Sequence, residues 1–222
     1  MKFLLFFFLI AVFPLSGFSE DEKIISDLKY GDADKVLIAA REAGERKLEA
    51  AAPALVKLLS HPDEDVRDAA VLALLDLSPS PERAEAFLFY LENSFYSIKP
   101  VIEEAVIDYW RKLKYEKAAE MMVAKYMEPS AKKERFQEIS GSLVPFLIEA
   151  GLPSGVEVLL GLQDWINLQE EDEVNLKSLF ARKESAGFFL KHFQKAHAKF
   201  LEIFFDSFDA SGLNAEERNF LL

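Results

Sequence analysis

The sequence predicts an all-α fold: an α-solenoid of antiparallel helix pairs stacked in a row, followed by a Phe-rich helical C-terminal unit. After residue 20 the apolar residues recur at helical spacing, and no segment shows sustained alternation of two. One apolar helix face returns along the chain at intervals in the thirties. The 222 residues contain no cysteine, so the fold must rest on apolar packing and not on disulfides.

Residues 1–19 have the pattern of a secretory signal peptide. Lys2 supplies the positive start, and residues 3–13 are uninterrupted apolar side chains. Gly17 and Ser19 place small side chains at the −3 and −1 positions of a cleavage site after Ser19. An uncleaved anchor is the alternative, but a membrane span needs about 20 apolar residues. We therefore expect an exported protein, periplasmic or secreted, with no membrane span after cleavage.

Residues 20–150 are expected to hold the helix pairs. Pro53 suits the first turn of a helix, and Asp63 can offer a carboxylate to the free amides of the next one. Ser80 and Pro81 mark another start in the same way. The face that the second helix of each pair would bury consists of Val36, Ala39, Ala40 and Ala43, then Val66, Ala69, Ala70 and Ala73, then Ile102, Ala105, Val106 and Tyr109, then Phe136, Ile139, Ser140 and Leu143.

The clearest repeat lies at residues 58–74, and it carries Leu58, Leu59, Pro62, Asp63, Val66, Arg67, Ala70, Ala73 and Leu74. On these residues the chain resembles the HEAT repeat family, in its short bacterial, PBS-lyase-like form. The resemblance implies a right-handed stack of helix pairs with a ligand surface on one side, and a protein-binding role more often than a catalytic one. It also implies that Arg67 ties the repeat corner together by bonding a loop carboxylate, either Asp63 or Asp32.

Residues 151–222 are expected to form a divergent helical unit packed on the repeats. Its main element is a long helix at about 185–208, with an apolar arc that includes Phe189, Phe193, Phe200 and Phe204. One interpretation is that residues 174–180 and 213–222 bury this arc. The other is an exposed stripe that associates with another chain.

Charge and motifs restrict the function. The chain has 26 Lys and Arg against 38 Asp and Glu, a net charge of −12, which argues against nucleic-acid binding. His192 and His197 are five positions apart, which does not suit a metal site on a helix. No nucleophile elbow or phosphate loop is present, so we predict no cofactor, no metal and no enzymatic activity. The acidic run at 170–173 fits either a helix N-terminus or a landing site for a basic partner.

Together these features predict an exported, non-catalytic scaffold or adaptor that binds a protein, favouring a basic segment of it. Its contacts would lie on the second helices, at Asp68, Glu103, Glu104, Asp108 and Arg111. One alternative is a self-assembling structural subunit of an envelope complex that uses the Phe stripe. A second is a HEAT-like lyase, which would need a pocket larger than about 300 Å³.

Overall fold

The computed structural model describes residues 19–95, 97–127, 133–161, 170–182, 185–186, 189–190 and 196–207. Every regular element in this part of the chain is a helix, as the sequence predicts. In order, the elements are α1 (Glu20–Tyr30), α2 (Ala33–Glu45), the 3-10 turn η1 (Glu49–Ala51), α3 (Ala52–Leu58), α4 (Glu64–Asp76), α5 (Pro81–Ser94), α6 (Pro100–Leu113), α7 (Glu116–Met127), α8 (Lys133–Ala150), α9 (Pro153–Gly161), α10 (Glu170–Phe180) and α12 (Ala198–Ser207).

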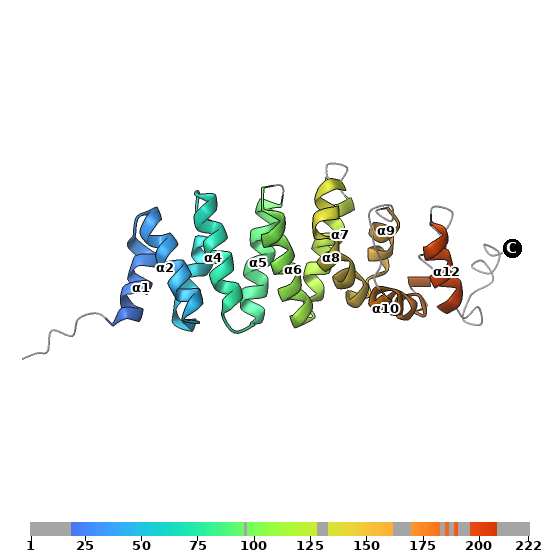
Figure 1. Cartoon of the computed structure of the whole chain (residues 1–222), viewed down its shortest axis with the longest axis horizontal. Coiled ribbons are helices and arrows are strands. Elements are labelled where there is room, and N and C mark those ends of the chain that lie inside the picture. The colour runs from blue at the N-terminus through green and yellow to red at the C-terminus, as the bar shows by residue number, and fades with distance from the viewer. Residues whose placement is uncertain are drawn as a thin grey trace, which may run out of the picture.

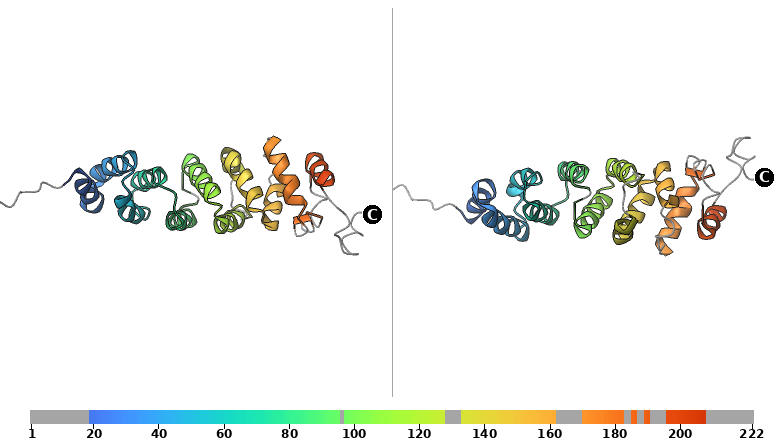
Figure 2. Two further views of the ribbon diagram at one scale, coloured as in Figure 1. Left: turned by 90° about the horizontal axis from the view of Figure 1, so that it is seen from below. Right: turned by 90° about the horizontal axis from the view of Figure 1, so that it is seen from above.

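The helices form two layers that run along the molecule. The second helices make one continuous layer, in which α2, α4, α6, α8, α10 and α12 each contact the next. The first helices lie on the other side, with contacts from α1 to α3, from α5 to α7 and from α7 to α9. Figure 1 shows the resulting open row, and Figure 2 shows the same row from below and from above. The predicted solenoid of helix pairs is confirmed.

Small residues allow the first two second helices to pack closely. Ala40 and Ala43 of α2 are fully buried, as is Ala70 of α4. A Cβ built on Gly44 would lie 3.0 Å from the Cα atom of Ala73, so the two backbones nearly touch there. Such an approach leaves no room for a larger side chain, because protein interiors are close-packed.

Helix ends follow the predicted signals. Asp63 and Ser80 each accept a hydrogen bond from a backbone amide in the first turn of the following helix, as predicted. Asp32 does the same for α2, for which no cap was predicted. At the opposite ends, Lys114 and Gly151 follow α6 and α8 with φ of 51° and 69°, in the left-handed region.

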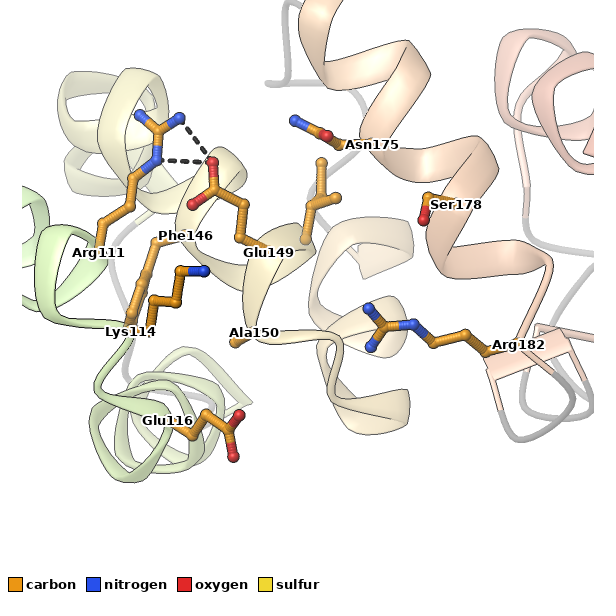
Figure 3. Close-up of a pocket in the computed structure, with 10 residues that line it drawn as sticks. Arg111, Lys114, Glu116, Phe146, Glu149, Ala150, Asn175, Ser178 and Arg182 are labelled. Carbon is orange, nitrogen blue, oxygen red and sulfur yellow. Dashed lines mark hydrogen bonds and ion pairs between the residues drawn. The ribbon is translucent and has the colours of Figure 1, made fainter.

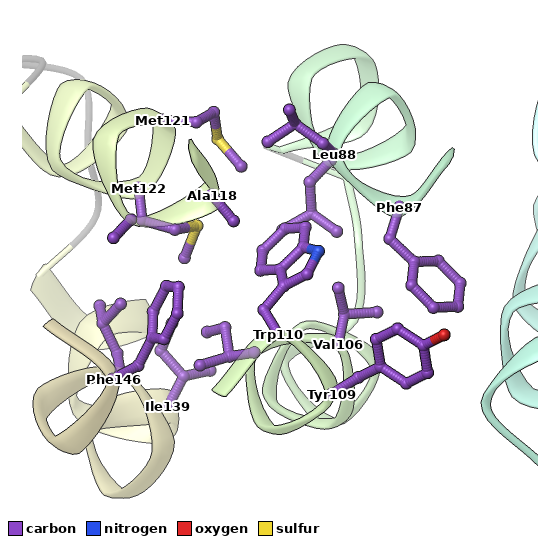
Figure 4. Close-up of a cluster of buried hydrophobic side chains, with 14 of the residues drawn as sticks. Phe87, Leu88, Val106, Tyr109, Trp110, Ala118, Met121, Met122, Ile139 and Phe146 are labelled. Atoms are coloured by element: carbon purple, nitrogen blue, oxygen red, sulfur yellow. The ribbon is translucent and has the colours of Figure 1, made fainter. Parts of the chain in front are cut away.

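Trp110 of α6 lies at the centre of the core, which is continuous across the pairs (Figure 4). Its indole Nε1 donates to the carbonyl of Ala84 in α5 at 3.0 Å, and its ring stacks on Phe146 of α8 at 6.3 Å. One side chain therefore joins three helices of successive pairs. Phe87 of α5 and Tyr109 of α6 add an edge-to-face contact at 5.1 Å.

The C-terminal region differs from the predicted long helix. Ala196 and His197 are not helical, and α12 begins only at Ala198. The apolar pattern continues through this break, because both segments bury a face against the same neighbour, α10. The position of residues 213–222 lies outside the described residues, as does Phe193.

Two further predictions concern the signal peptide and the domain boundary. The proposed signal peptide, except for Ser19, lies outside the described residues. None of the helices in the described part is both long and apolar enough to cross a bilayer. The division at residue 150 stays a prediction, and contacts from α7 to α9 and from α8 to α10 continue the layered arrangement across it.

Candidate partner-binding surface and pocket

Two of the five predicted contact residues are not available to a partner. Asp68 is 7% exposed and Glu103 is fully buried, so their assignment to the surface is wrong. A buried carboxylate must be paired or hydrogen-bonded, since removing a charge from water is costly. Both residues meet this requirement through side chains of the next helix pair.

Asp68 of α4 is held by Tyr90 of α5 and by Lys99, the residue before α6. The Tyr90 hydroxyl donates to Asp68 Oδ1 at 3.3 Å, and Lys99 Nζ lies 2.6 Å from Oδ2. The hydrogen bond and the charge of Asp68 raise the pKa of Lys99. Burial, reinforced by the charge of Asp68, raises the pKa of Tyr90 to about 12. Lys99 therefore stays protonated and Tyr90 neutral across the ordinary pH range.

Glu103 of α6 repeats this arrangement one helix pair later. Arg135 of α8 contacts Glu103 Oε2 through Nε at 2.7 Å and Nη2 at 2.5 Å, and the Tyr126 hydroxyl donates to Oε1 at 3.2 Å. Burial raises the pKa of Glu103, because its effect exceeds the opposing one of Arg135. The tyrosines follow their acids by 22 and 23 positions. We call each acid, tyrosine and cation a junction triad, because it joins one helix pair to the next.

Arg67 holds the repeat corner in a different way from the one expected. Its Nη1 donates to the backbone carbonyls of His61 and Pro62, at 2.8 and 2.9 Å. Neither Asp63 nor Asp32 receives it, because both carboxylates cap helices instead. Two loop carbonyls bind Nη1 of the guanidinium, so the structural role remains and the acceptor changes.

The stripe of predicted association residues is largely hidden. Phe189 and Phe204 are fully buried and Phe200 is 3% exposed, so these three cannot form a surface stripe. Phe180 of α10 contacts both Phe189 and Phe204, at centroid distances of 4.7 and 5.5 Å. The burial of the arc by residues 174–180 is the interpretation that the structure supports.

The acidic run at 170–173 lies within the first turn of α10 and not before the helix. Asp172 is 6% exposed, and Glu173 pairs with Lys199 of α12 at 2.8 Å. These two residues contribute to helix packing and do not form an open acidic surface.

The predicted contacts that remain outside the core lie together on α6. Glu104, Asp108 and Arg111 are all partly exposed and follow one side of that helix. Within the described residues, neither Glu104 nor Asp108 has an ion-pair partner, whereas Arg111 binds Glu149 of α8. Neighbouring second helices add further exposed side chains, which sequence reasoning did not assign: Ile38, Leu72, Asp76 and Glu138.

A pocket of about 380 Å³ opens beside this surface, at the C-terminal ends of α6 and α8 (Figure 3). The Arg111 guanidinium donates to Glu149 Oε1 at 2.8 and 2.6 Å and closes one side. The volume exceeds the limit of about 300 Å³ set for a lyase, so size does not remove that alternative. The pocket is lined by Arg111, Lys114, Glu116, Phe146, Ile148, Glu149, Ala150, Asn175, Ser178 and Arg182.

The histidines and carboxylates do not gather at a metal site in the described part of the chain. Among the described residues, no three His, Asp or Glu side chains converge in a way that could hold a metal ion. His61 instead accepts a hydrogen bond from the Asp63 amide through Nδ1, at 3.1 Å. His192 lies outside the described residues.

Comparison with known proteins finds similarity to a solved structure but not to a family model or a curated protein. No family model matches the sequence, and no curated protein matches it. Among solved structures, the chain is similar to the complex of CpcE and CpcF of phycocyanin lyase from Nostoc sp. PCC7120. The match has 16% sequence identity and a TM-score of 0.41, and it covers 90% of this chain and 99% of the other. The described residues of this chain form an all-helical row of helix pairs.

This comparison corrects one prediction. We expected a protein that is not an enzyme, but the similar solved structure belongs to a lyase complex. The absence of a nucleophile elbow or phosphate loop does not by itself exclude catalysis. With a TM-score of 0.41, the likeness assigns no reaction to this chain either.

Proposed function

We propose that this chain binds a protein partner along its second-helix layer, and that a basic segment with apolar side chains docks there. The observation that carries the proposal is a set of exposed or partly exposed carboxylates with no ion-pair partner among the described residues: Asp76, Glu104, Asp108 and Glu138. They belong to α4, α6 and α8, which are neighbours in one layer. An extended segment could therefore cross several of them.

Two carboxylates on the first-helix side already have cationic partners, although Glu92 and Glu120 of that layer have none among the described residues. Glu49, before α3, binds Arg83 at 3.0 Å, and Glu85 of α5 binds Lys117 at 2.5 Å. At Glu49 a backbone hydrogen bond from Ser78 is the main cause of a lowered pKa, and Arg83 adds to it. At Glu85 the hydrogen bond from Lys117 is the main cause of a lowered pKa. Carboxylates that already have cationic partners have less attraction left for a partner's Lys and Arg.

Apolar contacts are also present on the proposed face. Ile38 of α2 is 59% exposed, and Leu72 of α4 is 49% exposed. Apolar area buried at an interface supplies affinity, while surrounding charges steer the encounter and select the partner. The combination favours an amphipathic basic segment over a purely charged one.

The test begins with crosslinking in cells from a photoreactive residue at Asp108, compared with one at Glu92 on the first-helix layer. The captured partner is then purified and its affinity is measured for the double variant Glu104→Lys and Asp108→Lys. The control carries the same charge change on the other layer, Glu92→Lys and Glu120→Lys.

We expect the first pair of substitutions to weaken binding about tenfold or more and to reduce its salt dependence. The control should bind within about twofold of the original chain. Equal affinity of the two double variants, or a crosslinked segment without Lys and Arg, would refute the proposed face.

We also propose that the protein is exported, on the basis of residues 1–19. N-terminal sequencing of the protein from the periplasm or medium tests this, and recovery of an intact Met1 in the cytoplasm alone would contradict it. Removal of residues up to Ser19 has a structural consequence. The Ser19 hydroxyl accepts from the Glu22 amide at 3.2 Å, and Glu22 accepts from the Ser19 amide at 2.9 Å, so cleavage there takes away the cap of α1.

A further inference from the structure

The pocket between α6, α8 and α10 carries an excess of positive charge in an acidic protein. Its lining includes Arg111, Lys114 and Arg182 against Glu116 and Glu149, whereas the whole chain has a net charge of −12. Arg111 and Glu149 compensate each other at 2.6 Å. Glu116 is the first residue of α7, where the helix dipole favours a carboxylate. The two remaining cations are therefore the ones that characterise the pocket.

Lys114 and Arg182 have no ion-pair partner among the described residues. By contrast, Arg83, Lys99 and Arg135 each bind a carboxylate of another element. Figure 3 shows the Lys114 and Arg182 side chains reaching into the pocket from opposite walls. Each therefore faces the same pocket, and neither forms an ion pair with Glu116 or Glu149, the two carboxylates of its lining.

The Arg182 guanidinium lies against the backbone of the turn after α8. A Cβ built on Gly151 would lie 1.8 Å from Arg182 Nη1, so the guanidinium rests directly on this glycine. Gly151 also has φ of 69°, a left-handed conformation that suits glycine. The turn after α8 thus accommodates the arginine in this place, and the planar group can present two parallel N–H donors to an oxyanion.

Neutral donors complete the wall opposite Lys114. Asn175 and Ser178 lie one turn apart on α10, and both line the pocket. An amide and a hydroxyl can donate to oxygen atoms without adding charge. A volume of about 380 Å³ is within the range of small-molecule sites.

We infer that this pocket is a binding site for a small anionic ligand that carries a carboxylate or a phosphate group. Arg182 binds the acidic group in bidentate fashion, Lys114 approaches it from the opposite wall, and Asn175 and Ser178 donate to its remaining oxygens. The pocket binds its ligand whether or not the second-helix layer binds a protein, since none of these four residues belongs to the proposed docking surface.

The experiment is isothermal titration calorimetry of the full chain with two probes, succinate and inorganic phosphate, at an ionic strength held constant with sodium chloride. The test variants are Lys114→Met and Arg182→Met. The matched control is Lys47→Met, because Lys47 shares the φ of 51° and follows α2 as Lys114 follows α6. Circular dichroism and urea unfolding verify that all three variants remain folded.

We expect saturable one-to-one binding at millimolar or lower concentration, weakened about tenfold by either test variant and unchanged in the control. Binding of succinate alone identifies a carboxylate site, and binding of phosphate alone identifies a phosphate site. Three results would overturn the inference: no saturable heat with either probe, unchanged binding in both test variants, or an equal loss in Lys47→Met.

Discussion

Replacing Arg135 by methionine tests whether the junction triads hold successive helix pairs together. The substitution preserves much of the aliphatic bulk but leaves Glu103 buried without its cation. Arg135 contacts Glu103 Oε2 at 2.7 and 2.5 Å, and the Glu103 side chain is 0% exposed. Removing one partner of a buried ion pair costs about 3–5 kcal/mol, so the free energy of unfolding should fall by that amount at pH 7.

The pH dependence of this loss has a definite sign. Burial already raises the pKa of Glu103 above its ordinary value of 4.5, and Arg135 opposes that rise. Without Arg135 the pKa rises further, so the folded variant holds a proton on Glu103 at pH values where the unfolded chain does not. A group with a raised folded pKa stabilises the fold below its unfolded pKa, and loses that contribution as the pH rises through its folded pKa. The difference between Arg135→Met and the original chain should therefore shrink as the pH falls from 8 toward 5.

Urea unfolding followed by circular dichroism at several pH values measures this difference. Lys112→Met, an exposed change on α6, is the control and should stay within about 0.5 kcal/mol of the original chain. In the Arg135→Met background, Glu103→Gln should restore part of the lost stability because it removes the unpaired charge. A loss below about 1 kcal/mol, or one that grows as the pH falls, would show that the triad does not join the pairs as described.

Three further predictions concern packing and capping. Phe204→Ala should cost about 3–5 kcal/mol in urea unfolding, while Phe205→Ala should cost less than about 1 kcal/mol, because Phe204 is 0% and Phe205 55% exposed; equal effects would contradict the burial of the arc. Ser19→Ala in the full chain should lower stability by about 1 kcal/mol through loss of the α1 cap, and an unchanged unfolding midpoint would show that the cap does not contribute. Gly44→Leu should destabilise by about 1–3 kcal/mol because the α4 backbone lies against it, whereas a Cβ on Gly161 meets no atom within 4 Å among the described residues, so Gly161→Leu should cost less. Differential scanning calorimetry compares the two, and similar melting temperatures would refute the close approach.

The buried helix faces could be predicted because apolar residues recur at helical spacing along short stretches of sequence. Val36, Val66 and Ile102 all occupy the expected buried positions, and Asp63 caps α4 as its place before an apolar run indicates. These signals need only a few neighbouring residues. The same periodicity could not reveal the break at Ala196, since both segments around it bury apolar faces.

Asp68 and Glu103 were misplaced for a physical reason. On a helical wheel each lies beside the apolar face, and a charge there normally indicates solvent. Whether it is buried depends on cations supplied by the next pair, Lys99 and Arg135, which are distant in sequence. The similar spacing of the tyrosines from their acids, 22 and 23 positions, was the one available signal. The pocket also escaped prediction, because ends of separate helices form it.

The open row has a mechanical consequence. Each helix pair rests only on its neighbours, so the orientation of every later pair depends on the angle set at each joint before it. Asp68 and Glu103 lie at two consecutive joints in the middle of the row, and small rotations there are multiplied into large displacements at the far tip. Loosening either acid from its cation would displace α10 and α12. At the Glu103 joint it would also shift α8 and α10 relative to α6, and so move the walls of the pocket that Arg182 lines.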